Sequence, residues 1–98
     1  MERKLLTPDE TYAALKGLDG WAHHGNVLKR RFDFENFARA LSFVNAVGAI
    51  AESLNHHPDI KFGWGYAVIE TTTHDRGGIT DFDTSLAGRI DTLANKLQ

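Results

Sequence analysis

The pattern of hydrophobic and polar residues along the chain predicts three helices and two β-hairpins. In chain order we expect a helix from Thr7 to about Gly17, a hairpin of residues 21–24 and 27–33, a helix over about residues 35–55, a hairpin of residues 59–62 and 66–73, and a helix from Thr80. The order α-β-β-α-β-β-α predicts an α+β fold, in which one four-stranded antiparallel sheet has three helices packed on one face.

The first hairpin carries one polar residue on the side that should be buried. Its turn signal is Gly25-Asn26, a pair that favours a two-residue link between antiparallel strands. In the second strand Arg30 shares a face with Leu28, Phe32 and Phe34. Because a charge on a buried face needs compensation, we expect Arg30 to have a partner elsewhere in the chain.

The second hairpin should return His74 to the end of the central helix. The link of residues 63–65 is short, and if Phe62 faces Tyr66 the residue opposite His56 or His57 lies within two or three positions of His74. At about 3.3 Å per residue, that is the width of one active site. The three imidazoles should therefore line one pocket, where they are suited to proton transfer near neutral pH.

Each of these candidate residues also has a purely structural interpretation. A histidine before a helix-ending proline can satisfy the last helix carbonyls. Glu52 lies four residues before His56, so the two can meet either as an exposed ion pair or as a carboxylate that orients the ring. Asp83 lies three residues after Thr80, which suits a helix cap.

The long central helix has apolar residues around too much of its circumference for one buried face. The positions left for solvent are mostly small, namely Ser42, Ala46, Ala49 and Ser53. We interpret this face as a self-association surface. The alternative is a helix covered by its own sheet, with a few apolar residues left exposed.

Composition narrows the choice of function. A chain of 98 residues predicts a single domain over residues 1–98, and the absence of cysteine excludes disulfides and thiol chemistry. A net charge of −2 argues against nucleic acid as a partner. The first residues carry positive charge without a following apolar run, so we expect neither a signal peptide nor a membrane span, and a cytoplasmic location.

The sequence resembles the pterin-4a-carbinolamine dehydratases over nearly its whole length. The core of the resemblance is Glu52, then His56-His57-Pro58 after three residues, Trp64 after five, His74 after nine and Asp83 after eight. Further matches are Gly20-Trp21, the run Arg30-x-Phe32-x-Phe34-x-x-Phe37, and Thr72-Thr73-His74-Asp75 followed by Gly77-Gly78.

The resemblance implies a homo-oligomeric α+β enzyme, a dimer or tetramer, with a pterin pocket lined by His56, His57 and His74. It implies no metal and no bound cofactor. As substrate-binding residues of this pocket we assign Glu52, Pro58, Thr73, Asp75, Arg76, Asp83 and Trp21. Arg76 departs from the family pattern, because a large charged residue stands where a small one is usual; it either clamps the substrate or narrows the entrance.

The expected reaction is the dehydration of a 4a-hydroxytetrahydropterin, with acid and base roles for His57 and His74 and substrate orientation by His56 with Glu52. Two alternatives remain. Three histidines also suit a hydrolytic zinc site, although adjacent ligands strain a tetrahedral geometry. A non-catalytic dimerisation or transcriptional cofactor module would have no need of the histidines.

Overall fold

The computed structural model describes residues 3–97 and has the predicted fold class. Met1, Glu2 and Gln98, the ends of the predicted single domain, lie outside the described residues. The elements are α1 (Pro8–Leu15), β1 (Ala22–His24), β2 (Val27–Asp33), α2 (Phe37–Leu54), β3 (Asp59–Gly63), β4 (Tyr66–Thr71), the 3₁₀ turn η1 (His74–Arg76) and α3 (Asp81–Leu97). The four strands form one antiparallel sheet in the order β1-β2-β4-β3.

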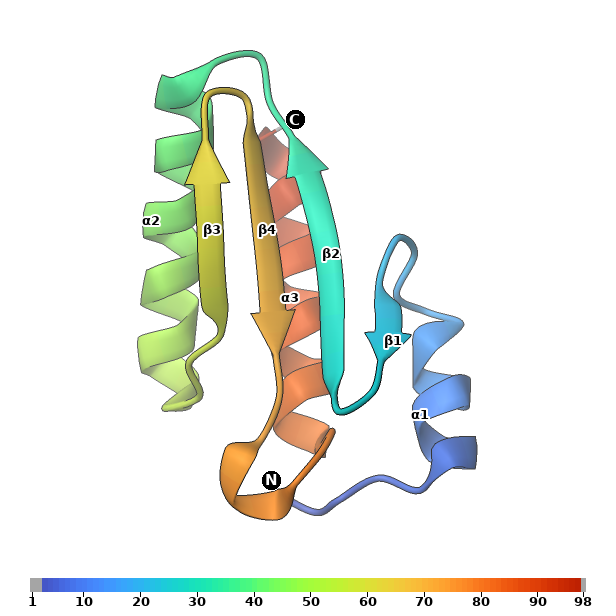
Figure 1. Ribbon diagram of the computed structural model, residues 1–98. Helices are drawn as coiled ribbons and strands as arrows, with labels where there is room; N and C mark the ends of the chain where they lie inside the picture. The colour runs from blue at the N-terminus through green and yellow to red at the C-terminus, as the bar shows by residue number, and fades with distance from the viewer. Residues whose placement is uncertain (1–2, 98) are drawn as a thin grey trace.

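The helices α2 and α3 lie behind the sheet, and α1 lies beside β1 (Figure 1). The helix α2 packs against α3, β3 and β4. The largest fully buried apolar side chains come from β2, β4 and these two helices, and include Leu28, Phe32, Phe43, Ile69, Leu86 and Ile90. The core is therefore the layer between the sheet and the helix pair, and α1 adds only the partly buried Leu15 to its edge.

The helix α1 begins with the capping box that the sequence predicts. The side chain of Thr7 accepts a hydrogen bond from the Glu10 N–H, and the Glu10 carboxylate accepts one from the Thr7 N–H. Both hydrogen bonds lower the pKa of Glu10, and the one from the Thr7 backbone has the larger effect. The contribution of this cap to stability is therefore present at neutral pH and is lost as the pH falls through the lowered pKa.

The end of α2 sets the direction in which the chain enters the site. Asn55 has a left-handed conformation (φ 49°, ψ 45°), and the His56 N–H binds the Ala51 carbonyl oxygen at 3.1 Å. This is a common way for a helix to stop. The helix therefore ends one residue earlier than predicted, and His56 and His57 leave its axis instead of continuing along one face.

The register of the second hairpin differs from the prediction by one position. Gly63 pairs with Tyr66 and Phe62 pairs with Ala67, whereas the prediction paired Phe62 with Tyr66. The reason is burial: Ala67 and Ile69 are completely buried, and both point to the helix-covered side of the sheet. The strand β4 also ends at Thr71, and Thr73 forms only an isolated bridge with Gly78.

Arg30 was expected to have a partner, and in the structure that partner is Asp91 of α3. One Asp91 oxygen accepts hydrogen bonds from the Arg30 guanidinium and from the Trp21 indole nitrogen, both at 2.8 Å. The Arg30 guanidinium also lies 4.3 Å from the Phe32 ring centroid. The prediction that Arg30 is compensated is confirmed, and Asp91 ties the first hairpin to the last helix.

Asp91→Asn is expected to lower the free energy of unfolding by about 2 kcal/mol, because the amide leaves a partly buried guanidinium without its counter-charge. A matched control is Glu70→Gln, since Glu70 forms an exposed pair with Lys29 at 3.2 Å. Pairs of that kind contribute about 0 to 1 kcal/mol. Urea unfolding measures both variants, and equal losses would mean that the Asp91 contacts add nothing beyond a surface pair.

Only part of the surface of helix α2 is covered by the other described residues. By length and composition alone it could cross a membrane, with a mean hydropathy of 1.2 over 18 residues, of which 22% are buried. Here its buried residues Phe43, Val47 and Ala51 face the sheet and α3, as in the core helix of a globular domain. Phe37 and Leu41 are 44% and 39% exposed. Of the four small residues expected to face solvent, Ser42, Ala49 and Ser53 are exposed and Ala46 is half-buried.

Candidate active site

The structure brings His56, His57 and His74 to one depression of about 310 Å³. It lies at the end of the sheet where α2 stops and η1 follows β4, the lower end in Figure 1. Its lining residues are Arg3, Asn55, His56, His57, Thr73, His74 and Asp75. Segments from the N-terminus, from the end of α2 and from the end of the second hairpin therefore meet here.

His56 is the buried member of the three and is bound to Asp83. Its side chain is 4% exposed, and its Nε2 lies 2.6 Å from Oδ1 of Asp83, which is completely buried. Asp83 was expected to cap the last helix, and it does so by accepting a hydrogen bond from the Thr80 N–H at 2.9 Å. The cap and the histidine contact therefore use the same carboxylate.

Two threonine hydroxyl groups complete the surroundings of Asp83. Thr71 Oγ1 donates to Oδ1 at 2.5 Å, and Thr73 Oγ1 donates to Oδ2 at 2.8 Å. With His56 and the Thr80 N–H, the carboxylate thus has four partners and needs no solvent. Such full satisfaction is what allows a carboxylate to be buried. The network joins β4, the residue before η1, the segment after α2 and the start of α3, and it holds the His56 ring in place.

His57 is bound to Glu52, which corrects the predicted pairing of Glu52 with His56. The Glu52 carboxylate contacts His57 Nε2, and both side chains are exposed, at 76% and 56%. The prediction used helical spacing, which fails because Asn55 is left-handed and turns the next residues away from the helix face. His57 is therefore the solvent-accessible histidine that a carboxylate orients.

His74 reaches the depression from a different part of the chain, the segment that follows β4. It is the first residue of η1 and is exposed, as is the neighbouring Asp75. Thr73, just before it, is buried and bound to Thr80 and Asp83. Gly77 ends the turn with a positive φ of 75°, a conformation that suits glycine. His74 is thus an exposed ring on an anchored backbone.

Five predicted binding residues do not line the depression, namely Trp21, Pro58, Arg76, Glu52 and Asp83. Trp21 lies in the core, edge-on to Phe32 at 6.1 Å and bound to Asp91. Pro58, which follows His57 in the sequence, is half-buried, and Arg76 is exposed at the end of η1. Asp83 and Glu52 each contact a histidine, Asp83 behind His56 and Glu52 beside His57.

Arg3 lines the depression and was missed by the sequence analysis. Its guanidinium donates to the Asn55 carbonyl oxygen at 2.5 Å and lies 3.4 Å from His56 Nδ1. These partners are more than fifty residues away in the sequence. No local pattern around Arg3 marks it, so only the folded chain could reveal it.

The arrangement suits acid-base chemistry more than metal binding. Within residues 3–97 no group of three histidine or carboxylate side chains is placed to hold a metal ion. His56 already has a partner at each ring nitrogen. The exposed rings of His57 and His74 remain available to exchange protons with a small molecule in the depression.

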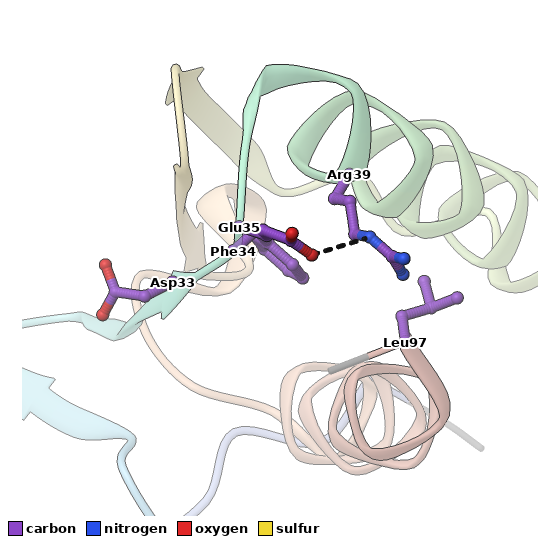
Figure 2. Close-up of a pocket in the computed structure, with 5 residues that line it drawn as sticks. All are labelled: Asp33, Phe34, Glu35, Arg39 and Leu97. Atoms are coloured by element: carbon purple, nitrogen blue, oxygen red, sulfur yellow. Dashed lines mark ion pairs between the residues drawn. The ribbon is translucent and has the colours of Figure 1, made fainter.

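A larger hollow lies elsewhere and lacks this chemistry. It has a volume of about 460 Å³ and lies where β2 ends, α2 begins and α3 ends. Figure 2 shows Arg39 between Glu35 and Leu97, with Asp33 pointing away. The Arg39–Glu35 pair is 3.7 Å long and exposed, and no histidine lines the hollow. We therefore place the candidate active site at the histidines.

Fold and site together define a small α+β protein with three histidines in one surface depression. Comparison with protein families is more specific: residues 4–93 match the model of pterin 4 alpha carbinolamine dehydratase. The chain belongs to this family, which confirms the resemblance found in the sequence.

The relatives in sequence cover most of the chain. A protein of Sulfurisphaera tokodaii, provisionally named as a pterin-4-alpha-carbinolamine dehydratase, is 44% identical over 92% of this chain and 97% of its own. A protein of Rubrobacter xylanophilus with the same provisional name is 46% identical over 90% of this chain and 83% of its own.

Two solved structures share the fold. A protein of Brucella melitensis described as a transcriptional coactivator/pterin dehydratase has a TM-score of 0.89 and 30% identity, and the match covers 93% of this chain and 99% of that one. A pterin dehydratase-like protein identified as a RuBisCO assembly factor has a TM-score of 0.62 and 29% identity, and the match covers 76% of this chain and 86% of that one.

Proposed function

We propose that the protein is a dehydratase that converts 4a-hydroxytetrahydrobiopterin, a pterin-4a-carbinolamine, to quinonoid dihydropterin and water, and so helps to recycle tetrahydrobiopterin. The observation that carries the proposal is the meeting of three histidines in one depression, two of them exposed and one of these paired with a carboxylate. Membership of the dehydratase family supports the choice of substrate.

The reaction requires one proton to be delivered and one to be removed. The bond between C4a and the hydroxyl oxygen breaks, N5 loses its proton, and a double bond forms between C4a and N5. No electrons are gained or lost overall. Hydroxide is a poor leaving group, so an imidazolium should protonate it as it departs, while a neutral imidazole takes the N5 proton.

The exposure of the histidines supports a division of these roles. His57 and His74 are both exposed and line the depression from two different segments of the chain, which supports acid and base roles on the two sides of the ring. Such an arrangement would serve either stereoisomer at C4a. His56 is buried and bound at both ring nitrogens, so it takes neither role and forms part of the wall against which the substrate lies.

A binding experiment on the wild-type chain tests the pterin site without turnover. Ring-nitrogen NMR spectra recorded with added 7,8-dihydropterin should show saturable shifts of the His57 and His74 signals. His24 is the internal control, because it is exposed on the edge strand β1 and does not line the depression. Equal shifts of the His57, His74 and His24 signals, or no shift of any of them, would contradict a pterin site at the depression.

The second candidate is a non-catalytic binding module. The Brucella melitensis neighbour is described as both a coactivator and a pterin dehydratase, and the other neighbour as an assembly factor. The enzyme is favoured here because the buried Asp83 network and the Glu52–His57 pair orient two of the histidines, which a docking surface would not require.

We also propose that the protein assembles as a dimer or, more specifically, a dimer of dimers. Two features support this. The helix α2 leaves Phe37 and Leu41 exposed beside a stripe of small residues. The strands β1 and β3 are open sheet edges, and pairing with another copy would protect them. Helix packing and edge-to-edge pairing would then serve as two symmetric interfaces.

Ala49→Glu is expected to split the larger assembly, because it places an unpaired charge in a closely packed helix interface. The cost is about 3 kcal/mol. Ala13→Glu is the matched control, since Ala13 is an exposed alanine of α1. Sedimentation velocity at micromolar concentration measures both. A monomeric wild-type chain would show that our interpretation of α2 is wrong.

A further inference from the structure

Arg3 is fixed in place by contacts along the N-terminal segment. The Leu6 N–H binds the Ile79 carbonyl oxygen at 2.8 Å, and the Lys4 N–H binds an Asp81 carboxylate oxygen at 3.1 Å. The Arg3 side chain is itself bound to the Asn55 carbonyl oxygen. Its guanidinium is therefore a built part of the depression wall.

The Phe82 ring connects Arg3 with His56. The guanidinium carbon lies 4.5 Å from the centroid of the Phe82 ring, a cation–π distance. The His56 ring lies 5.7 Å from the same centroid. Phe82 therefore helps to hold the guanidinium next to the imidazole, where Nη1 lies 3.4 Å from Nδ1.

The two neighbours of His56 select one tautomer of its ring. A guanidinium has only hydrogen-bond donors, so Nδ1 facing Arg3 must offer its lone pair. The proton of the neutral ring is then on Nε2, where it is donated to Asp83 Oδ1 at 2.6 Å. The opposite tautomer would turn a lone pair toward the carboxylate and an N–H toward the guanidinium.

We propose that Arg3 is a positioning residue of the site: it donates to Nδ1 of His56, holds the ring in the orientation in which Nε2 meets Asp83, and reinforces the tautomer that Asp83 selects. The guanidinium, imidazole and carboxylate then form one continuous row from the depression into the core. The consequence for turnover rests on the proposed dehydratase function, whereas the consequence for the ring does not.

Ring-nitrogen NMR of His56 tests the proposal without any substrate. The wild-type ring should show a protonated Nε2 and an unprotonated Nδ1. In Arg3→Met the Nδ1 signal should move toward that of an unprotonated ring nitrogen without a hydrogen-bond donor, while Nε2 stays protonated. Arg3→Lys should restore part of the wild-type Nδ1 signal, and Lys4→Met, which removes a charge from the same segment, should leave it unchanged. A wild-type Nδ1 signal in Arg3→Met would overturn the proposal.

A double-mutant cycle tests whether Arg3 acts through His56. Arg3→Met should lower kcat/KM by about tenfold in the wild-type background and by less than about twofold in a His56→Gln background. An equal loss in both backgrounds would overturn the proposal, since Arg3 would then act independently of His56. If the wild-type chain has no dehydratase activity, the proposed function fails, and the NMR pattern alone decides the role of Arg3.

Discussion

Replacing His57 or His74 by alanine is expected to lower the dehydration rate by about 10²-fold or more while leaving the fold intact. Both rings are exposed, and neither belongs to the hydrophobic core, so their removal opens no cavity. What is lost is the proton donor or acceptor in the transition state. Single-turnover kinetics with a chemically generated carbinolamine measures the rate, and urea unfolding measures the stability.

His24→Ala is the matched control for these variants, because His24 is an exposed histidine on β1 outside the depression. It should keep both the wild-type rate and the wild-type stability. If His57→Ala or His74→Ala lost stability in proportion to rate, the histidines would be structural. If all three variants kept the rate, acid-base catalysis by these rings would be wrong.

Asp83→Asn is expected to have the largest effect on stability, a loss of about 3 to 5 kcal/mol in the free energy of unfolding. Asp83 is completely buried and accepts from four donors. Asparagine offers one acceptor oxygen, and its amide group would point N–H donors at groups that themselves donate. At least one buried donor is then left without a partner.

Asp75→Asn provides the comparison, since Asp75 is an exposed carboxylate on the same depression. A surface change of this kind typically alters stability by less than about 0.5 kcal/mol. Urea unfolding of both variants measures the difference. Equal stability of the two variants would mean that the Asp83 network does not hold the site together.

The fold could be predicted because its signals are local. The Gly25-Asn26 turn, the capping residue Thr7 and the apolar alternation of the strands each lie within a few residues of what they determine. The register of the second hairpin was wrong by one position because burial of Ala67 and Ile69, not the length of the link, decides which residues face the core.

The site could be predicted only in part, because its partners depend on backbone details. Spacing predicted that His74 would return to His56 and His57. It could not predict the left-handed conformation of Asn55. Because of that conformation Glu52 contacts His57, and His56 contacts Asp83 instead. Arg3 reaches the site from the other end of the chain, and no pattern in the sequence could indicate that contact.

The central claim is that this chain accelerates loss of water from a 4a-hydroxytetrahydropterin. Stopped-flow absorbance with chemically generated carbinolamine, at several protein concentrations, tests it most directly. We predict that quinonoid dihydropterin forms faster than in buffer, in proportion to the wild-type protein, and that His57→Ala combined with His74→Ala returns the rate to that of buffer. A wild-type rate equal to the buffer rate at every protein concentration would contradict the account.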